Sequence, residues 1–418
     1  MAEKLTPQQK MAVENRGGRL LVSAAAGSGK TKVLVDRLLS YLIDPVDPAN
    51  IDDFLIITYT KAAASELRGK IASKLAEKVA EDPLNRHLQR QQQRIYLAKI
   101  STVHAFCGEI LREYAYRMDL SADFRVADEQ ECQRIRQTAM ENVLQEAYEH
   151  TASDAEFCAF IDTQGIGRND RLVPELLMQV YDAARCHLDP QKWLADCLEQ
   201  TEADSYTDAI QSPYGAFLVD RLRGWLQLQI TALERCVNLC SAAKGMEKVS
   251  ALLLDTVNQL VFLRDCESWD AICRNRNIDF GRLVFPKSLE DEDLKERIKA
   301  VRDACKKGLE KQLKPFSDSS SQVLEDLQAS TMAQRGLIKM VEAFSKAFEQ
   351  AKKSHRVVDF SDLEHRMLDL LLGRSRSTPT LLAKEIGSRF REIMVDEYQD
   401  SNGVQDAIFS ALTEKRQN

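Results

Sequence analysis

A phosphate-binding loop is indicated by residues 24–31, which read AAAGSGKT. Glycines let the backbone approach an anion closely, because they carry no Cβ, and successive N–H groups at such a turn hold phosphate oxygens. A helix N-terminus after the loop adds favourable partial charge. The pattern assigns Lys30 to the β- and γ-phosphates and the Thr31 hydroxyl to Mg²⁺. The residues predicted to hold ATP here are Ala26, Gly27, Ser28, Gly29, Lys30 and Thr31.

The generic pattern is met at every position except Ala24, which stands where the first glycine is usual. The alternative is a Gly-Ser turn with an incidental lysine. The expected context of a strand before the loop and a helix after it favours the phosphate loop.

Two acids form the second half of the predicted site. Asp396 and Glu397 follow an apolar run, as expected for acids at the end of a buried strand. Asp396 is predicted to hold Mg²⁺ and Glu397 to polarise the attacking water, so Lys30, Asp396 and Glu397 are the predicted catalytic residues. The alternative is a strand end with solvated acids. The two halves lie too far apart in sequence for adjacent strand–helix units, which requires an inserted domain.

Other polar residues follow or precede the expected strands. Gln9 carries an amide that can read the edge of adenine, although a solvated loop is the simpler interpretation of that residue alone. Tyr59 and Thr60 follow one strand, and Thr102 and His104 follow another. Hydroxyls and helix N-terminal amides suit backbone phosphates, and an aromatic ring can stack on a base, so these four are candidate nucleic-acid contacts. A lone histidine at a strand end is equally compatible with a structural role.

The elements that must position these residues follow from apolar patterning. Short apolar runs, each followed by a helical pattern, predict buried parallel strands at Leu20–Ala24, Phe54–Thr58, Ile100–Val103 and Ile393–Asp396. Apolar residues spaced by three and four predict helices at Leu172–Cys186, Phe217–Ala243, Val249–Ile272, Leu289–Lys311 and Val323–Lys353. A capping box at Asp128–Glu131 predicts another helix running toward His150. Breaks are expected at Gln164–Asn169, His187–Pro190, Ser212–Gly215, Arg274–Pro286 and Pro315–Ser321.

These patterns predict an α/β domain with a parallel sheet, divided in the sequence by a large all-helical insertion. The expected divisions are residues 1–121 for the first part of the ATP-binding domain, 122–354 for the inserted domain, and 355–418 for the second part, which carries the two acids.

Composition excludes several classes of protein. Hydrophobic residues make up 44% and charged residues 29%, with a net charge of −7, which is typical of a globular protein rather than a disordered one. No run approaches the ~20 apolar residues of a membrane span, and the first residues lack a signal-peptide pattern. We therefore expect a cytoplasmic protein with no membrane partner. The 10 cysteines contain no C-x-x-C pair, which favours buried, reduced thiols.

Taken in order, these residues resemble the superfamily 1 helicases of the UvrD/RecB type. The resembling features are Gln9, the phosphate loop, the T-[FY]-T segment with Tyr59, T-x-H-x-F with His104, and DE-x-QD from Asp396. The resemblance narrows to the AddA subunits of AddAB (RexAB) helicase–nucleases through the triple alanine before the loop, the string ISTVHAFC, and the segment VDFSDLEH at 358–365. It covers about residues 4–125 and 355–412 well.

The resemblance implies a RecA-like P-loop NTPase domain, here with a truncated parallel sheet and the helical insertion. It implies an ATP-dependent 3′→5′ DNA helicase that acts on single-stranded DNA and double-strand DNA ends in recombinational repair, with a nuclease domain and an AddB/RexB-type partner. Lys61 and Ala62 depart from the UvrD pattern TFTNKAA, so that family's lysine contact with DNA is not carried over.

The sequence stops at Asn418, one helix after DE-x-QD, so we expect an N-terminal fragment that is nearly inactive alone. Three alternatives stay open: a UvrD/Rep-type translocase without nuclease, a P-loop ATPase scaffold acting on DNA, and a non-catalytic interaction module. The scaffold would need an LSGGQ signature, which the sequence lacks.

Overall fold

The structure is a computed structural model, and it describes residues 5–25, 27–118, 120–164, 172–199, 206–286, 289, 291–373 and 375–413. The chain divides into two compact units. One unit consists of Met1–Glu149, Arg171–Trp193 and Met340–Asn418, and the other of His150–Asp170 and Leu194–Lys339. The second unit therefore interrupts the first twice in the sequence.

A parallel sheet forms the centre of the first unit. Its strands are β1 (Phe54–Thr58), β2 (Lys99–Thr102) and β5 (Glu392–Val395), in the order β2-β1-β5. Ile57 of β1 pairs with Ser101 on one side and with Val395 on the other. Every residue of β1 is buried, which explains why its sequence is apolar without alternation. Three of the four predicted strands are confirmed.

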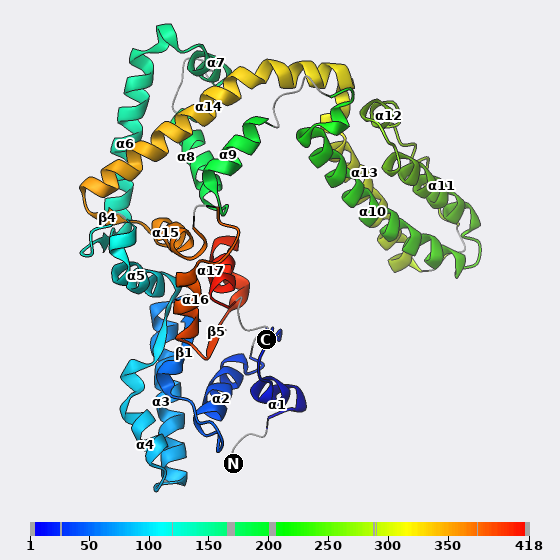
Figure 1. The fold of residues 1–418 in the computed structure, drawn as a ribbon. Coiled ribbons are helices and arrows are strands. Elements are labelled where there is room, and N and C mark those ends of the chain that lie inside the picture. Colours follow the sequence, from blue (N-terminus) through cyan, green and yellow to red (C-terminus); the bar gives the residue numbers. More distant parts are fainter. Residues whose placement is uncertain are drawn as a thin grey trace. The chain divides into compact units, whose positions relative to one another are not determined.

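Helices cover both faces of this sheet (Figure 1). Leu55 and Ile57 pack into a cluster with one set of helices, while Phe54 and Ile56 pack into a cluster with the other. The first set is α5 (Val103–Glu113), α15 (Phe360–Leu372), α16 (Leu381–Ser388) and α17 (Gly403–Thr413). The second is α2 (Lys30–Leu42), α3 (Lys61–Glu81) and α4 (Arg86–Gln93), and α1 (Pro7–Glu14) packs against α2. The result is a three-layer α/β/α arrangement.

The predicted strand at Leu20–Ala24 is not present. Residues 19–25 have no helix or strand, and Leu20, Leu21 and Val22 are 42%, 75% and 41% exposed. A strand forms when a neighbouring strand pairs with its N–H and C=O groups. Within the described residues, β5 pairs only with β1, and no strand is hydrogen-bonded to this apolar segment in a sheet. Without a lateral partner the segment has nothing to bury it, so this prediction is wrong for the structure.

A second, two-stranded parallel sheet joins distant parts of the chain. Its strands are β3 (Arg125–Val126) and β4 (Val357–Val358). The N–H of Ala127 donates to the carbonyl of Val358 at 3.0 Å. The sheet thereby holds together the two ends of the long helical stretch.

Residues 129–354 are helical wherever the structure describes regular elements. The helices are α6 (Glu129–Glu149), α7 (Ala155–Gln164), α8 (Leu172–Arg185), α9 (Pro190–Glu199), α10 (Pro213–Ser241), α11 (Glu247–Arg264), α12 (Trp269–Arg274), α13 (Glu292–Gln312) and α14 (Ser320–Ser354). Short 3₁₀ turns occur at Ile51–Asp53, Ile95–Leu97, Ala115–Arg117, Thr151–Ser153, Ala209–Gln211, Lys314–Ser317 and Tyr398–Asp400. Within the described ranges, every helix is too short or too polar to serve as a membrane span.

Two details of the helix predictions are corrected. The single helix expected at Val249–Ile272 is two helices, because Ser268 accepts the N–H of Ala271 and so begins α12. The capping box at Asp128–Glu131 is half formed: Asp128 accepts the N–H of Glu131 at 2.8 Å, but the Glu131 carboxylate pairs with Arg125. The expected break at Gln164–Asn169 falls mostly outside the described residues.

The second unit is held by its own apolar core. Helices α10 and α11 pack along one another, and α13 packs against α10 (Figure 1). Leu226, Leu233, Leu253 and Leu260 are fully buried between them, and Trp269 of α12 is buried in the same cluster. The apolar periodicity of these helices is therefore accounted for by packing.

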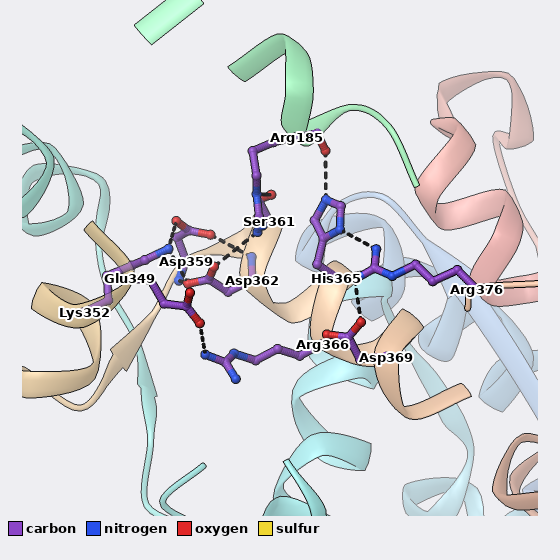
Figure 2. Close-up of polar contacts among 10 residues, drawn as sticks. All are labelled: Arg185, Glu349, Lys352, Asp359, Ser361, Asp362, His365, Arg366, Asp369 and Arg376. Atoms are coloured by element: carbon purple, nitrogen blue, oxygen red, sulfur yellow. Dashed lines mark hydrogen bonds and ion pairs between the residues drawn. The ribbon is translucent and has the colours of Figure 1, made fainter. Parts of the chain in front are cut away.

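A buried polar cluster fastens three helices of the first unit together (Figure 2). Lys352 of α14 is 3% exposed, and its Nζ lies 2.7 Å from Asp359 and 2.5 Å from Asp362. At the end of α8, Arg185 donates to the Ser361 hydroxyl at 2.8 Å and lies 3.2 Å from Asp362. Asp359 also caps α15, because it accepts the N–H of Asp362 at 2.7 Å. The cluster therefore joins α8, α14 and the start of α15.

His365 extends this cluster along α15 (Figure 2). Its Nε2 lies 2.9 Å from the carbonyl of Arg185, which can only accept, so Nε2 carries the hydrogen. Its Nδ1 accepts from the guanidinium of Arg376 at 2.9 Å. Burial, together with the positive charges of Arg185 and Arg376, lowers the pKa of His365 to about 4. The histidine is therefore neutral near pH 7, in one tautomer.

Candidate nucleotide and nucleic-acid site

The register of the sheet brings the predicted residues that follow β1, β2 and β5 to one edge. Thr58 at the end of β1 pairs with Thr102 at the end of β2, and Ile57 pairs with Val395 at the end of β5. Because parallel strands end at the same edge of a sheet, the residues that follow them emerge together. Ligands of open α/β sheets bind at this carboxyl edge.

The phosphate loop has the backbone conformation that its glycines predict. Gly27 and Gly29 have φ values of 76° and 82°, in the left-handed region that glycine adopts without strain. Gly29 immediately precedes α2, so Lys30 and Thr31 lie in the first helical turn. Lys30 Nζ donates to the carbonyl of Ala24 at 3.2 Å, which folds the ammonium back over the loop. Ala26 lies outside the described residues.

Gln9 lies against this loop. Its Nε2 donates to the carbonyl of Ser28 at 3.0 Å, and its Oε1 accepts the N–H of Thr6 at 2.9 Å. Thr6 in turn accepts the N–H of Gln9, which completes a capping box at the start of α1. The amide of Gln9 therefore has a structural role beside the loop: the capping box follows the T-x-x-Q pattern of the sequence, whereas the contact with Ser28 has no local signal.

Asp396 lies at the end of β5, within electrostatic reach of the loop. Its N–H donates to the carbonyl of Ile57 at 2.9 Å, which continues the pairing of β5 with β1. Burial raises the pKa of Asp396 above its usual range, and the charge of Lys30 acts in the opposite direction. The pairing of this lysine with this acid stays a prediction.

Glu397 adopts an unusual backbone conformation. Its φ of 52° and ψ of 44° lie in the left-handed region, which costs free energy for a residue with a Cβ. Its side chain is exposed and accepts the amide of Gln399, and its N–H donates to Asp396 Oδ1 at 3.1 Å. Strained residues of this kind often occur at functional sites, where the surroundings enforce the conformation.

Arg37 fixes the loop helix against the strand that carries the acids. Arg37 of α2 is 7% exposed, and its Nε lies 2.6 Å from Oε1 of Glu392 in β5. Its Nη1 donates to the carbonyl of Ala12 in α1 at 2.6 Å. One guanidinium therefore joins α1, α2 and β5.

The donor atoms at this edge suit a magnesium nucleotide. Thr31 supplies a hydroxyl from the first turn of α2 and Asp396 a carboxylate from the end of β5, and both residues are half-buried. Mg²⁺ prefers oxygen ligands and is commonly held by one or two protein oxygens together with nucleotide phosphates. The residues present therefore fit the predicted metal.

Tyr59 and Thr60 lie where β1 leads into α3. The Tyr59 hydroxyl is hydrogen-bonded to Ser401 Oγ at 2.5 Å, and the ring is half-buried. Thr60 is exposed and caps α3 by accepting the N–H of Ala63 at 3.0 Å. The first turn of α3 thus opens at the same edge as the acids.

Thr102 and His104 lie where β2 leads into α5. Thr102 caps α5 by accepting the N–H of Ala105 at 3.3 Å. His104 Nε2 lies 3.1 Å from Oε1 of Glu364, and its ring packs against Phe360 with centroids 4.5 Å apart. His104 therefore has a structural partner and remains half-buried at the edge.

Three residues of this region have a role that local sequence patterns do not predict. Arg37 and Glu364 are buried charges whose hydrogen-bond partners lie between 25 and 355 positions away, so no local pattern identifies them. Phe360 is 58% exposed beside His104. The one signal that could have found Phe360 and Glu364 is the segment VDFSDLEH, which contains both and carries the family resemblance.

The prediction of buried, reduced cysteines agrees with the structure in part, since Cys186 is exposed and four others are half-buried. All ten cysteines are free thiols. Five are buried, namely Cys107, Cys236, Cys240, Cys266 and Cys305.

Comparison with known proteins identifies relatives along the whole chain. Proteins named as a subunit of an ATP-dependent helicase/nuclease match from Natranaerobius thermophilus (33% identity over 98% of this chain), Clostridium novyi (31% over 99%) and Acetivibrio thermocellus (32% over 98%). The chain covers 32%, 33% and 34% of these relatives, so it spans about a third of their length. The family described as UvrD/REP helicase N-terminal domain matches residues 5–418. Because this match spans nearly the whole chain, the chain belongs to the UvrD/REP helicase N-terminal domain family.

Proposed function

We propose that this chain is the ATP-binding part of an ATP-dependent DNA helicase. The observation that carries the proposal is the ion pair of 2.6 Å between Arg37 and Glu392, which holds the helix that follows the phosphate loop against the strand that precedes Asp396. A phosphate loop paired with an acid at the end of a neighbouring strand is the arrangement that P-loop NTPases use for phosphoryl transfer.

Each residue has a distinct role in this proposal. The backbone of Gly27–Thr31 and the Lys30 ammonium hold the phosphates, and the Gln9 amide is assigned to the adenine edge. Thr31 and Asp396 would hold Mg²⁺, which neutralises charge that develops on the transferring phosphate. Glu397 orients and polarises the attacking water.

The DNA side of the proposal uses the same edge of the sheet. Thr60 and Thr102 begin α3 and α5, whose first N–H groups suit backbone phosphates. Tyr59, His104 and the exposed Phe360 offer rings on which bases can stack. Stacking contacts accept any base, and a helicase that moves along DNA must bind every sequence that it meets.

The proposals on the domain fold and on the activity of the whole protein rest on the named relatives and on the family resemblance. We infer a RecA-like P-loop NTPase domain with a truncated sheet, interrupted by a helical domain at 122–354. We propose that the whole protein is a 3′→5′ helicase of the AddA type within a helicase–nuclease that processes double-strand DNA ends in recombinational repair in the cytoplasm, with an AddB/RexB-type partner. The relatives are named as a subunit of a helicase/nuclease, which supports the assignment of a nuclease and a partner to the whole protein.

Nucleotide titration tests the proposal. Residues 1–418 should bind ATP with Mg²⁺ in calorimetry, and Lys30→Ala should weaken binding by more than about tenfold, since a charge-assisted phosphate contact is worth about 1.5–3 kcal/mol. Lys74→Ala is the matched control, because Lys74 is a lysine of α3 paired with Glu77 on the surface.

The two variants must behave differently for the proposal to stand. Equal affinity in the unaltered chain and in Lys30→Ala would remove the loop from the nucleotide site. An equal loss in both lysine variants would indicate a general charge effect rather than a phosphate contact.

A further inference from the structure

A buried carboxylate connects the DNA-facing edge to the segment that follows the acids. Glu364 of α15 is 7% exposed, and its Oε1 accepts hydrogen bonds from His104 Nε2 at 3.1 Å and from Gln405 Nε2 at 2.7 Å. Its Oε2 lies 3.5 Å from the amide nitrogen of Asn402. Burial raises the pKa of Glu364, but its hydrogen bonds with His104 and Gln405 outweigh burial and hold the pKa below its usual range.

The partners of Glu364 belong to two functional segments. His104 follows β2, at the edge assigned to DNA. Asn402 begins α17 by accepting the N–H of Gln405 at 2.8 Å, and only the turn Tyr398–Asp400 and Ser401 separate Asn402 from Glu397. The ionised Glu364 carboxylate bonds to both segments and so fixes the residues after β2 relative to the start of α17.

A hydrogen bond that does not involve Glu364 also connects the DNA-facing edge to the segment that follows the acids. Tyr59, which follows β1, is bonded to Ser401. Both aromatic residues predicted to meet DNA are therefore tied to the five residues 401–405, which directly follow the 3₁₀ turn after the acid pair. Such contacts give the two sites a physical means of influencing one another.

We propose that Glu364 is a positioning residue that couples DNA binding at His104 to the nucleotide site at Asp396 and Glu397. This inference rests on the proposed function. Glu364 touches neither ligand; it sets the place of His104 and the start of α17 together. When DNA engages His104, the altered bond to Glu364 shifts the segment 401–405, and with it the loop of Glu397. The coupling is reciprocal, so ATP changes the affinity for DNA by the same factor.

A binding cycle with residues 1–418 tests this coupling. The probes are a fluorescent, non-hydrolysable ATP analogue with Mg²⁺ and an oligothymidylate, each titrated with and without the other. In the unaltered chain the second ligand should change the affinity for the first by about 5–150-fold, the usual range of coupling between sites. Glu364→Gln, which keeps the shape and removes the charge, should reduce this factor below about twofold while changing each separate affinity by less than about threefold.

Two further variants separate positioning from folding. Asn402→Asp keeps the cap of α17 but replaces the amide donor with a carboxylate that repels Glu364, so it should also reduce the coupling factor. Glu109→Gln is the control, because Glu109 lies on α5 like His104 but pairs with Lys99. A purely structural role for Glu364 would lower the unfolding temperature and both affinities and leave the coupling factor unchanged.

The outcomes are distinct. A coupling factor near one in the unaltered chain, or one unchanged in both Glu364→Gln and Asn402→Asp, would overturn the role of Glu364 while both ligands still bind. Failure of the unaltered chain to bind either ligand would instead overturn the proposed function, and the inference with it.

Discussion

Arg37 and Glu392 form an ion pair of 2.6 Å across a sequence separation of 355 residues. Their side chains are 9% and 21% exposed. The pair lies between the helix that begins at the phosphate loop and the strand that ends at the acids. It therefore sets the spacing of the two halves of the nucleotide site.

Arg37→Ala should destabilise the first unit markedly. The substitution leaves the Glu392 carboxylate and the carbonyl of Ala12 without their donor, and removing one member of a buried pair costs about 3 kcal/mol. Urea denaturation measures the loss. Lys10→Ala, which breaks an exposed pair with Glu14, should cost less than about 1 kcal/mol. Equal midpoints for both variants would contradict the role given to Arg37.

His365 should make the stability sensitive to acid. Its pKa in the folded protein is about 4, below the ordinary value of 6.5, so the unfolded chain takes up the proton first as the pH falls. The stabilisation is fully present above pH 6.5 and is lost between pH 6.5 and 4. The free energy of unfolding should fall over this window by up to about 3 kcal/mol more in the unaltered chain than in His365→Gln. Parallel pH profiles of the two proteins would place His365 in contact with solvent.

Tyr59 offers two groups that substitutions can separate. Tyr59→Ala removes the ring and should weaken binding of an oligothymidylate by about 1–3 kcal/mol if a base stacks there. Tyr59→Phe keeps the ring and loses only the bond to Ser401, so its affinity should stay within about threefold of the unaltered chain. Fluorescence anisotropy measures both. An unchanged affinity in Tyr59→Ala would leave the ring with a packing role alone.

Glu397 should show a conflict between stability and activity. Glycine adopts the left-handed conformation without strain, so Glu397→Gly should raise the free energy of unfolding by about 0.5–1 kcal/mol. The same change removes the carboxylate proposed to polarise water, so it should abolish ATP hydrolysis in the longer protein, since residues 1–418 alone are expected to be nearly inactive. Glu397→Gln is the control, since it should abolish hydrolysis with little change in stability. A less stable glycine variant would show that the conformation at Glu397 carries no strain.

Local patterns predicted the elements that depend on neighbours in sequence. The apolar run of β1 was identified in this way, as were most helix positions between 129 and 354. Contacts between distant segments were not predictable, because a buried charge such as Glu364 gives no signal until the fold brings His104 and Gln405 to it. The error at Leu20–Ala24 has the same origin, since an apolar run becomes a strand only beside another strand.

The open side of β5 affects how the protein behaves in concentrated solution. Among the described residues, β5 bonds to β1 along one side only, and Leu20, Leu21 and Val22 are exposed. An uncovered strand side presents free backbone donors and acceptors to any extended chain that meets it. Concentrated solutions of residues 1–418 should therefore self-associate, because the exposed apolar segment 20–22 of one molecule can add to the open side of β5 in another. A charge in that segment, as in Leu21→Lys, should keep the protein monodisperse in light scattering.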